Sequence, residues 1–157
     1  MRIAFTKARV GRSDVMCIER DDGTAAFERE RSGFVVHDLL HFAVETVLDE
    51  PYGLYGVFAS GREPGEFGRD PETGAARPKP GSPRVDVENV VNLFAQERAG
   101  ALREDQFADA IALACPDAAS LLTEPTCERV RRRFDELLGA WDRLEPGDSL
   151  VLQFPTS

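Results

Sequence analysis

His-Asp-Leu-Leu-His-Phe-Ala-Val-Glu-Thr-Val-Leu-Asp, residues 37–49, is the stretch of sequence that decides the fold. At 100° per residue, its aliphatic side chains gather on one arc of a helix: Leu39, Leu40, Ala43, Val44 and Val47. Asp38, Glu45 and Asp49 are predicted to lie opposite that arc. We therefore expect an amphipathic helix that covers a sheet.

The sheet is predicted on the N-terminal side of this helix, where residues 2–7 and 14–30 read as three short strands. Asp22-Gly23 is a strong signal for a two-residue hairpin loop, because glycine supplies the positive φ that the turn needs. Counting outward from that loop places Ile18 opposite Phe27 on the face that packs against helices. The other face is then expected to carry Cys17, Glu19 and Glu28.

The remaining elements follow the helix along the chain. Pro51 suits the first turn of a second, short helix. Three further helical patterns cover residues 85–98, 104–115 and 125–143, and the alternation of Leu150, Leu152 and Phe154 indicates a closing strand.

Together these elements predict an α+β fold in one domain, residues 1–157. We expect a small, mainly antiparallel sheet of about four strands, formed by the N-terminal hairpins and the C-terminal strand and covered by about five helices. Residues 61–84 are rich in Gly and Pro and are predicted to form a long loop, which is either mobile or functional.

Composition narrows the functional classes. The 157 residues carry a formal net charge of −9, which disfavours nucleic acid and anionic membrane surfaces as partners. Three widely spaced cysteines and no long apolar segment predict a cytoplasmic protein without disulfides. The motifs of nucleotide-binding loops are absent from the sequence, so no cofactor-binding residue is predicted.

The candidate site is a strip formed by His37, His41 and Glu45, which stand four residues apart on one side of the predicted helix. His37 and His41 are the only histidines in the chain, and an i, i+4 pair of histidines supplies two metal ligands from one helix. Eight residues of helix rise about 12 Å, so only one adjacent pair of the strip reaches a single ion. The strip is therefore a candidate divalent metal site in which at most one adjacent pair binds the ion.

Further ligands would come from loop carboxylates such as Glu63, Glu66 or Asp70. The string differs from the zinc-peptidase pattern H-E-x-x-H because Asp38 stands where that pattern has Glu, so peptidase activity is not predicted. Without metal, His41 and Glu45 are candidates for a catalytic acid–base pair, although no nucleophile is indicated beside them and no small-molecule ligand is specified.

The alternative is a non-enzymatic interaction or scaffold domain in which the histidines are structural. A scaffold needs an exposed apolar patch or a dimer face, and a homodimer is one such assembly. A concave site with converging polar groups would favour the first hypothesis, and a convex surface the second.

The segment from Val36 to Thr46, followed by Tyr55-Gly56 and Ala59-Ser60-Gly61, resembles a group of small bacterial proteins that share an H-D-L-x-H-F-x-V-E helix. The resemblance covers residues 2–70 at most. It implies a shared fold and no activity, because that group has no assigned function. No catalytic residue is carried over from it.

Overall fold

The computed structural model describes residues 1–29, 34–62 and 86–156. Within these ranges it contains four strands and five α-helices, with a short 3-10 turn before the last helix. They are β1 (Arg2–Thr6), β2 (Val15–Glu19), β3 (Ala25–Arg29), α1 (Phe34–Leu48), α2 (Leu54–Ala59), α3 (Val87–Arg98), α4 (Glu104–Ala114), α5 (Glu124–Asp142) and β4 (Ser149–Gln153). The predicted α+β fold is confirmed, and helical residues outnumber strand residues.

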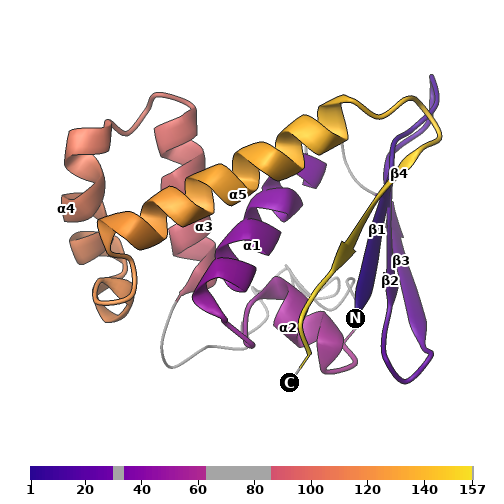
Figure 1. The fold of residues 1–157 in the computed structure, drawn as a ribbon, viewed down its shortest axis with the longest axis horizontal. Helices are drawn as coiled ribbons and strands as arrows, with labels where there is room; N and C mark the ends of the chain where they lie inside the picture. Colours follow the sequence, from indigo (N-terminus) through magenta and orange to yellow (C-terminus); the bar gives the residue numbers. More distant parts are fainter. Residues whose placement is uncertain (30–33, 63–85, 157) are drawn as a thin grey trace, which may run out of the picture.

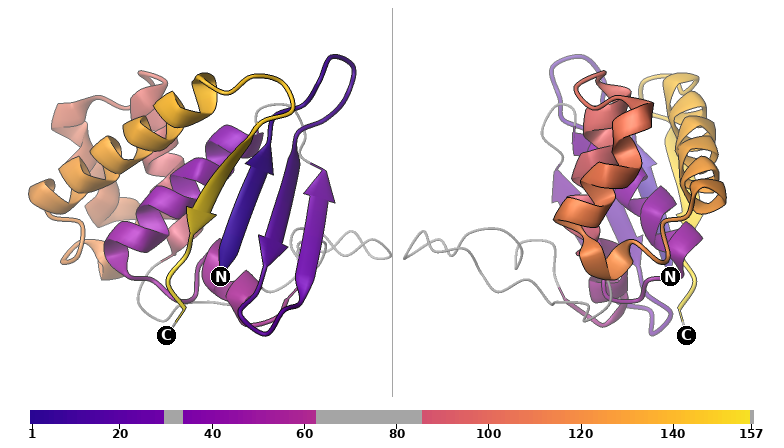
Figure 2. Two further views of the ribbon diagram at one scale, coloured as in Figure 1. Left: turned by 45° about the vertical axis from the view of Figure 1, so that its right-hand side comes forward. Right: turned by 90° about the vertical axis from the view of Figure 1, so that its left-hand side faces the viewer.

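The strands form one antiparallel sheet in the order β3-β2-β1-β4. The closing strand lies beside β1, where Leu152 pairs with Ile3. All the helices lie on one side of this sheet (Figures 1 and 2). The inner face of the sheet therefore carries the most deeply buried apolar residues of the strands, which include Ile3, Phe5, Met16 and Ile18.

The predicted hairpin register is wrong by one residue. The NH group of Arg20 donates to the carbonyl of Thr24 (2.8 Å), so three residues rather than two form the loop. Gly23 has φ +86°, which suits the left-handed position of a three-residue loop. As a result Phe27 pairs with Cys17 instead of Ile18, and it lies on the outer face with 72% of its surface exposed.

Helix α1 is the centre of the helical layer. It contacts α2, α3 and α5 and lies beside the inner face of the sheet (Figure 1). Because neighbours surround its middle, α1 is buried on nearly every side from Asp38 to Glu45. The prediction that Asp38 and Glu45 lie opposite the buried arc is therefore wrong, since both are buried.

The end of α1 turns the chain sharply toward α2. Asp49 adopts a left-handed conformation with φ 51°, and the NH group of Glu50 donates to the carbonyl of Glu45 (3.0 Å). This closure of the last helical turn is a Schellman arrangement, and aspartate tolerates its left-handed position better than most residues. It brings the first residues of α2 back against the side of α1.

The described residues bear on two further sequence predictions, the long loop and the absence of a membrane-spanning segment. The predicted loop at 61–84 lies outside the described residues from 63 onward. Among the described residues, no helix has the length and apolar character needed to cross a membrane.

Candidate functional site

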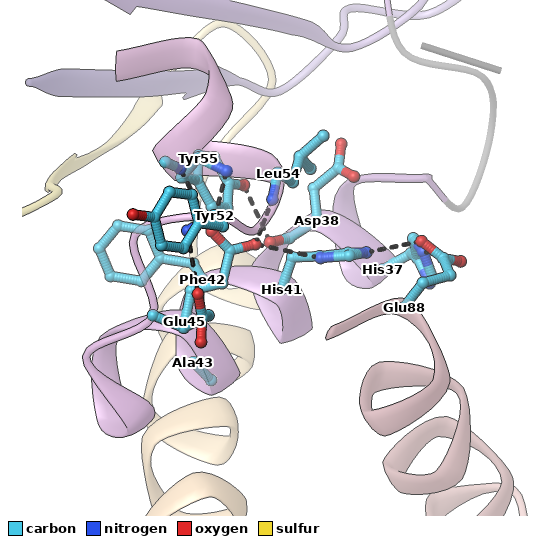
Figure 3. A network of polar contacts seen from close by, with 12 residues as sticks. His37, Asp38, His41, Phe42, Ala43, Glu45, Tyr52, Leu54, Tyr55 and Glu88 are labelled. Carbon is cyan, nitrogen blue, oxygen red and sulfur yellow. Dashed lines mark hydrogen bonds and ion pairs between the residues drawn. The ribbon is translucent and has the colours of Figure 1, made fainter. Parts of the chain in front are cut away.

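Two helices bring the candidate site together. His37 and His41 stand one turn apart on α1, and their rings meet edge to face with centroids 4.8 Å apart. Glu88, in the first turn of α3, reaches across to both rings (Figure 3). Its Oε1 lies 3.7 Å from His37 Nε2, and its Oε2 lies 3.4 Å from His41 Nε2.

One nitrogen from each imidazole and one oxygen of Glu88 all lie within 4.8 Å of one another. This group of three is close enough to hold a metal ion. The side chains of His37 and Glu88 are 32% and 36% exposed, whereas that of His41 is 5% exposed. The group is thus open to solvent beside His37 and Glu88 and closed behind His41.

Glu45 closes the site from behind. Its Oε1 lies 3.2 Å from Nδ1 of His41, on the opposite edge of the ring from Glu88 (Figure 3). The Glu45 side chain is completely buried. His41 therefore stands between two carboxylates, one buried and one half-exposed.

Backbone NH groups at the start of α2 hold the Glu45 carboxylate. Leu54 donates to Oε1 (2.8 Å), while Tyr55 and Gly56 donate to Oε2 (2.9 and 3.4 Å). These NH groups belong to the first turn of a helix and have no partner within that helix, so the carboxylate satisfies them. A buried carboxylate needs such donors, because burial without them costs several kcal/mol (about 2–7 for a neutral polar group and more for a charge).

Gly53 leaves the room that this carboxylate needs. A Cβ atom added to Gly53 would lie 2.2 Å from Cδ of Glu45, which is far inside van der Waals contact. The backbone of Gly53 has φ −75°, a value that any residue adopts. The requirement for glycine at this position therefore comes from the Glu45 side chain and not from backbone strain.

A second contact ties α2 to α1. The hydroxyl group of Tyr55 donates to the backbone carbonyl of Asp38 (2.9 Å), and Tyr55 is fully buried. Its ring packs edge to face against Phe42 with centroids 5.6 Å apart. The start of α2, which carries the donors to Glu45, is thereby fixed against the same helix that carries both histidines.

The surroundings shift the pKa of both members of the buried pair. Burial of the His41 ring acts to lower its pKa, but the hydrogen bonds and charges of Glu45 and Glu88 outweigh this effect and raise it to about 9. Burial raises the pKa of Glu45, against the opposing effect of His41 and of the Tyr55 and Leu54 NH groups. Both shifts are upward, so the pair binds its proton more tightly in the folded protein than in the unfolded chain.

The structure brings together part of the predicted strip and adds a residue that sequence reasoning missed. His37 and His41 converge as an adjacent pair, whereas Glu45 binds the far nitrogen of His41 and lies outside the group of three. Glu88 takes the place that we expected for a loop carboxylate. The proposed loop ligands lie outside the described residues: Glu63, Glu66 and Asp70.

Only its position beside an apolar residue near the start of the predicted helix at 85–98 could have drawn attention to Glu88. It directly follows Val87, the first buried residue of a helix whose apolar side must pack on something. The sequence gives no spacing rule that connects this helix to His41, because the contact is tertiary.

Comparisons with known proteins add no functional assignment. No family model, curated protein or solved structure matches this chain. The resemblance based on the H-D-L-x-H-F-x-V-E helix stays a prediction. The geometry of His37, His41 and Glu88 is therefore the basis for assigning a function.

Proposed function

We propose that His37, His41 and Glu88 bind one divalent transition-metal ion. The observation that carries the proposal is the convergence of three donor atoms from two helices within 4.8 Å. Imidazole nitrogen suits zinc, iron, cobalt and nickel, whereas calcium and magnesium prefer sites made of oxygen alone. The donor set therefore favours a transition metal.

The distances support this proposal. Donor atoms bound about 2.1 Å from a tetrahedral ion lie about 3.4 Å from each other. The two contacts of Glu88 with the histidines, made by its two different oxygens, measure 3.4 and 3.7 Å. With one oxygen of Glu88, the three donor atoms lie within 4.8 Å of one another. Contraction of the group around an ion needs side-chain movements on the order of 1 Å, and the half-exposed side chains of His37 and Glu88 have room for them.

Two histidines and a glutamate are a donor set of catalytic zinc sites, in which water or a substrate takes the remaining position. The exposed side of the group, next to His37 and Glu88, is where such a ligand would approach. This arrangement suits an enzyme as well as a binding protein, and the property proposed is binding of the metal.

Metal uptake by protein purified without a polyhistidine tag tests the proposal. After treatment with a chelator, the protein should bind one zinc or cobalt ion in competition with a chromophoric chelator. His37→Ala, His41→Ala and Glu88→Ala should each weaken binding by at least about tenfold, because three donors share the ion. Glu128→Ala is the matched control, since Glu128 is exposed on α5 and outside the site.

A metal-free role is the second candidate, and one observation favours it. Both ring nitrogens of His41 already face carboxylates, at 3.2 Å for Glu45 and 3.4 Å for Glu88. In that arrangement a protonated His41 joins α1 to α3 as a structural ion pair. Absence of zinc, cobalt or nickel binding by the wild-type protein would exclude the metal site and leave this role.

A further inference from the structure

We propose that Glu45 is a positioning residue for the metal site, held in place by the start of α2. It contacts no metal in this scheme and acts only through His41. The proposal rests on the proposed function, because it concerns how tightly the same site binds its metal. It places a determinant of metal affinity in α2, an element that contributes no ligand.

The contact with Glu45 fixes which ring nitrogen of His41 carries a hydrogen atom. A carboxylate only accepts hydrogen bonds, so the contact between Glu45 and His41 requires a hydrogen atom on Nδ1. A neutral imidazole carries a hydrogen atom on only one of its two ring nitrogens, and the other nitrogen then has the free lone pair. Glu45 thus directs the lone pair of Nε2 toward Glu88 and His37.

The Glu45 carboxylate is held rigidly by the start of α2. Its two oxygens accept hydrogen bonds from the consecutive NH groups of Leu54, Tyr55 and Gly56. These donors belong to the backbone of a helix that Tyr55 fixes to α1. A side chain held in this way keeps one orientation and transmits it to the imidazole, as outer carboxylates do for many metal-bound histidines.

Gly53 provides the space that the Glu45 carboxylate occupies. The carboxyl carbon of Glu45 occupies the space that a side chain at position 53 would fill, since the added Cβ would lie 2.2 Å away. An alanine there must displace the Glu45 carboxylate from its donors. Gly53→Ala therefore disturbs the positioning of His41 without altering a metal ligand or an atom of His41.

The experiment compares two glycine-to-alanine variants of the full chain in their affinity for zinc and cobalt. Gly53→Ala should weaken binding by about 10-fold to 100-fold, the range found when an outer-shell partner of a ligand is lost. Gly139→Ala in α5 is the matched control, because its added Cβ meets only the end of Arg143 at 3.4 Å. Its affinity should equal that of the wild-type protein.

The outcomes separate the two proposals. If the wild-type protein binds neither zinc nor cobalt, the proposed function fails, and the positioning role fails with it. If the wild-type protein and Gly53→Ala bind with equal affinity, the metal site stands and the positioning role is overturned. Circular dichroism of the metal-free proteins establishes that Gly53→Ala is folded.

Glu45→Gln provides a second test that does not depend on the folding of the Gly53 variant. Glutamine keeps the length of the side chain but removes the negative charge that holds Nδ1–H, so zinc affinity should again fall about 10-fold to 100-fold. Nitrogen-15 NMR of the zinc-loaded protein reads the ring directly. The wild-type protein should show a slowly exchanging Nδ1–H on His41, and the variant should lose it. An unchanged affinity together with an unchanged Nδ1–H signal would overturn the proposal.

Discussion

Raising the pH from about 6 to about 9 should destabilise the metal-free protein, because His41 then loses a proton that the folded state binds tightly. The pKa of His41 is raised from its ordinary value of 6.5 to about 9 in the folded protein. A group with a raised pKa stabilises the folded state most fully below the unfolded value, and this stabilisation is lost as the pH rises through the folded value. The affected window therefore lies between about pH 6.5 and pH 9.

The size of the effect follows from the same shift. Since one pKa unit corresponds to about 1.4 kcal/mol, the shift of His41 represents on the order of 3 kcal/mol of folding free energy. Most of that contribution should disappear between about pH 6 and pH 9. The raised pKa of Glu45 acts in the same direction, since the pair holds its proton more tightly when folded.

Urea unfolding followed by circular dichroism, with a chelator present, measures this loss. The comparison ends near pH 9 because burial also raises the pKa of the Cys115 and Cys127 thiols. Their contributions to the free energy of unfolding change only above the ordinary thiol pKa of 9.0. His41→Gln should be less stable at about pH 6 and nearly independent of pH across the window. Equal stability of the wild-type protein at both ends, or an equal loss in His41→Gln, would refute the reasoning.

Three further predictions concern the same region. At about pH 7, zinc binding should release about one proton, because His41 must lose the hydrogen on Nε2. Titration calorimetry in two buffers of different ionisation enthalpy measures the number of protons released. A heat of binding that is independent of the buffer would contradict this. Glu45→Ala should lower the free energy of unfolding by about 3–5 kcal/mol, because the buried NH groups of Leu54 and Tyr55 and the ring of His41 then lack their acceptor. Urea titrations measure this loss. In the control, Glu128→Ala should change the free energy of unfolding by less than about 0.5 kcal/mol. Gly56→Ala should destabilise the protein although alanine is the better helix former, because its Cβ would lie 1.9 Å from the carbonyl oxygen of Pro51. The midpoint of thermal unfolding of Gly56→Ala, measured together with that of Gly139→Ala, tests whether the substitution destabilises the protein. A Gly56→Ala variant as stable as the wild-type protein would show that the backbone at Pro51 shifts to make room for the added Cβ.

Elements with strong local signals were predictable from the sequence. The periodicity of residues 125–143 corresponds to α5 at 124–142, and the alternation around Leu152 corresponds to β4. Both patterns are local, so neighbouring residues alone decide them. The class of fold followed from the order of such elements along the chain.

The hairpin shows how one wrong local choice propagates. Asp22-Gly23 fits a two-residue loop, yet the side chain of Asp22 accepts from the NH group of Thr24 (2.9 Å) within a loop one residue longer. Because side chains alternate along a strand, the shift by one residue moves Phe27 to the other face. The Asp22-Gly23 pair correctly predicted the position of the turn but did not specify the number of residues in its loop.

The site was predictable only as far as a single helix reaches. Helical spacing places His37 and His41 together, and the structure confirms that contact. The same wheel placed Glu45 opposite the apolar arc or, as part of the strip, at its border and partly buried. Its complete burial was not predicted, because periodicity cannot show that α1 has neighbours on almost every side. Glu88 depends on the packing of α3 against α1, which no local pattern specifies.

The metal-free network and the proposed metal site differ in what lies between His41 and Glu88 and in the positions of the His37 and Glu88 side chains. Below the raised pKa of His41, a proton on Nε2 joins the ring to Glu88 in the metal-free protein, and an ion that replaced this proton would meet a nitrogen already aimed at the same carboxylate. Glu45 holds the opposite edge of the ring in both states, and its hydrogen bonds to α2 need not change. Rearrangement on binding of the proposed metal should therefore be confined to the half-exposed side chains of His37 and Glu88. Because the proton and the ion compete for one nitrogen, metal affinity should increase about tenfold with each unit of rising pH until the pH reaches the pKa of His41. Competition titrations at several pH values measure this dependence, and an affinity that does not change with pH would contradict it.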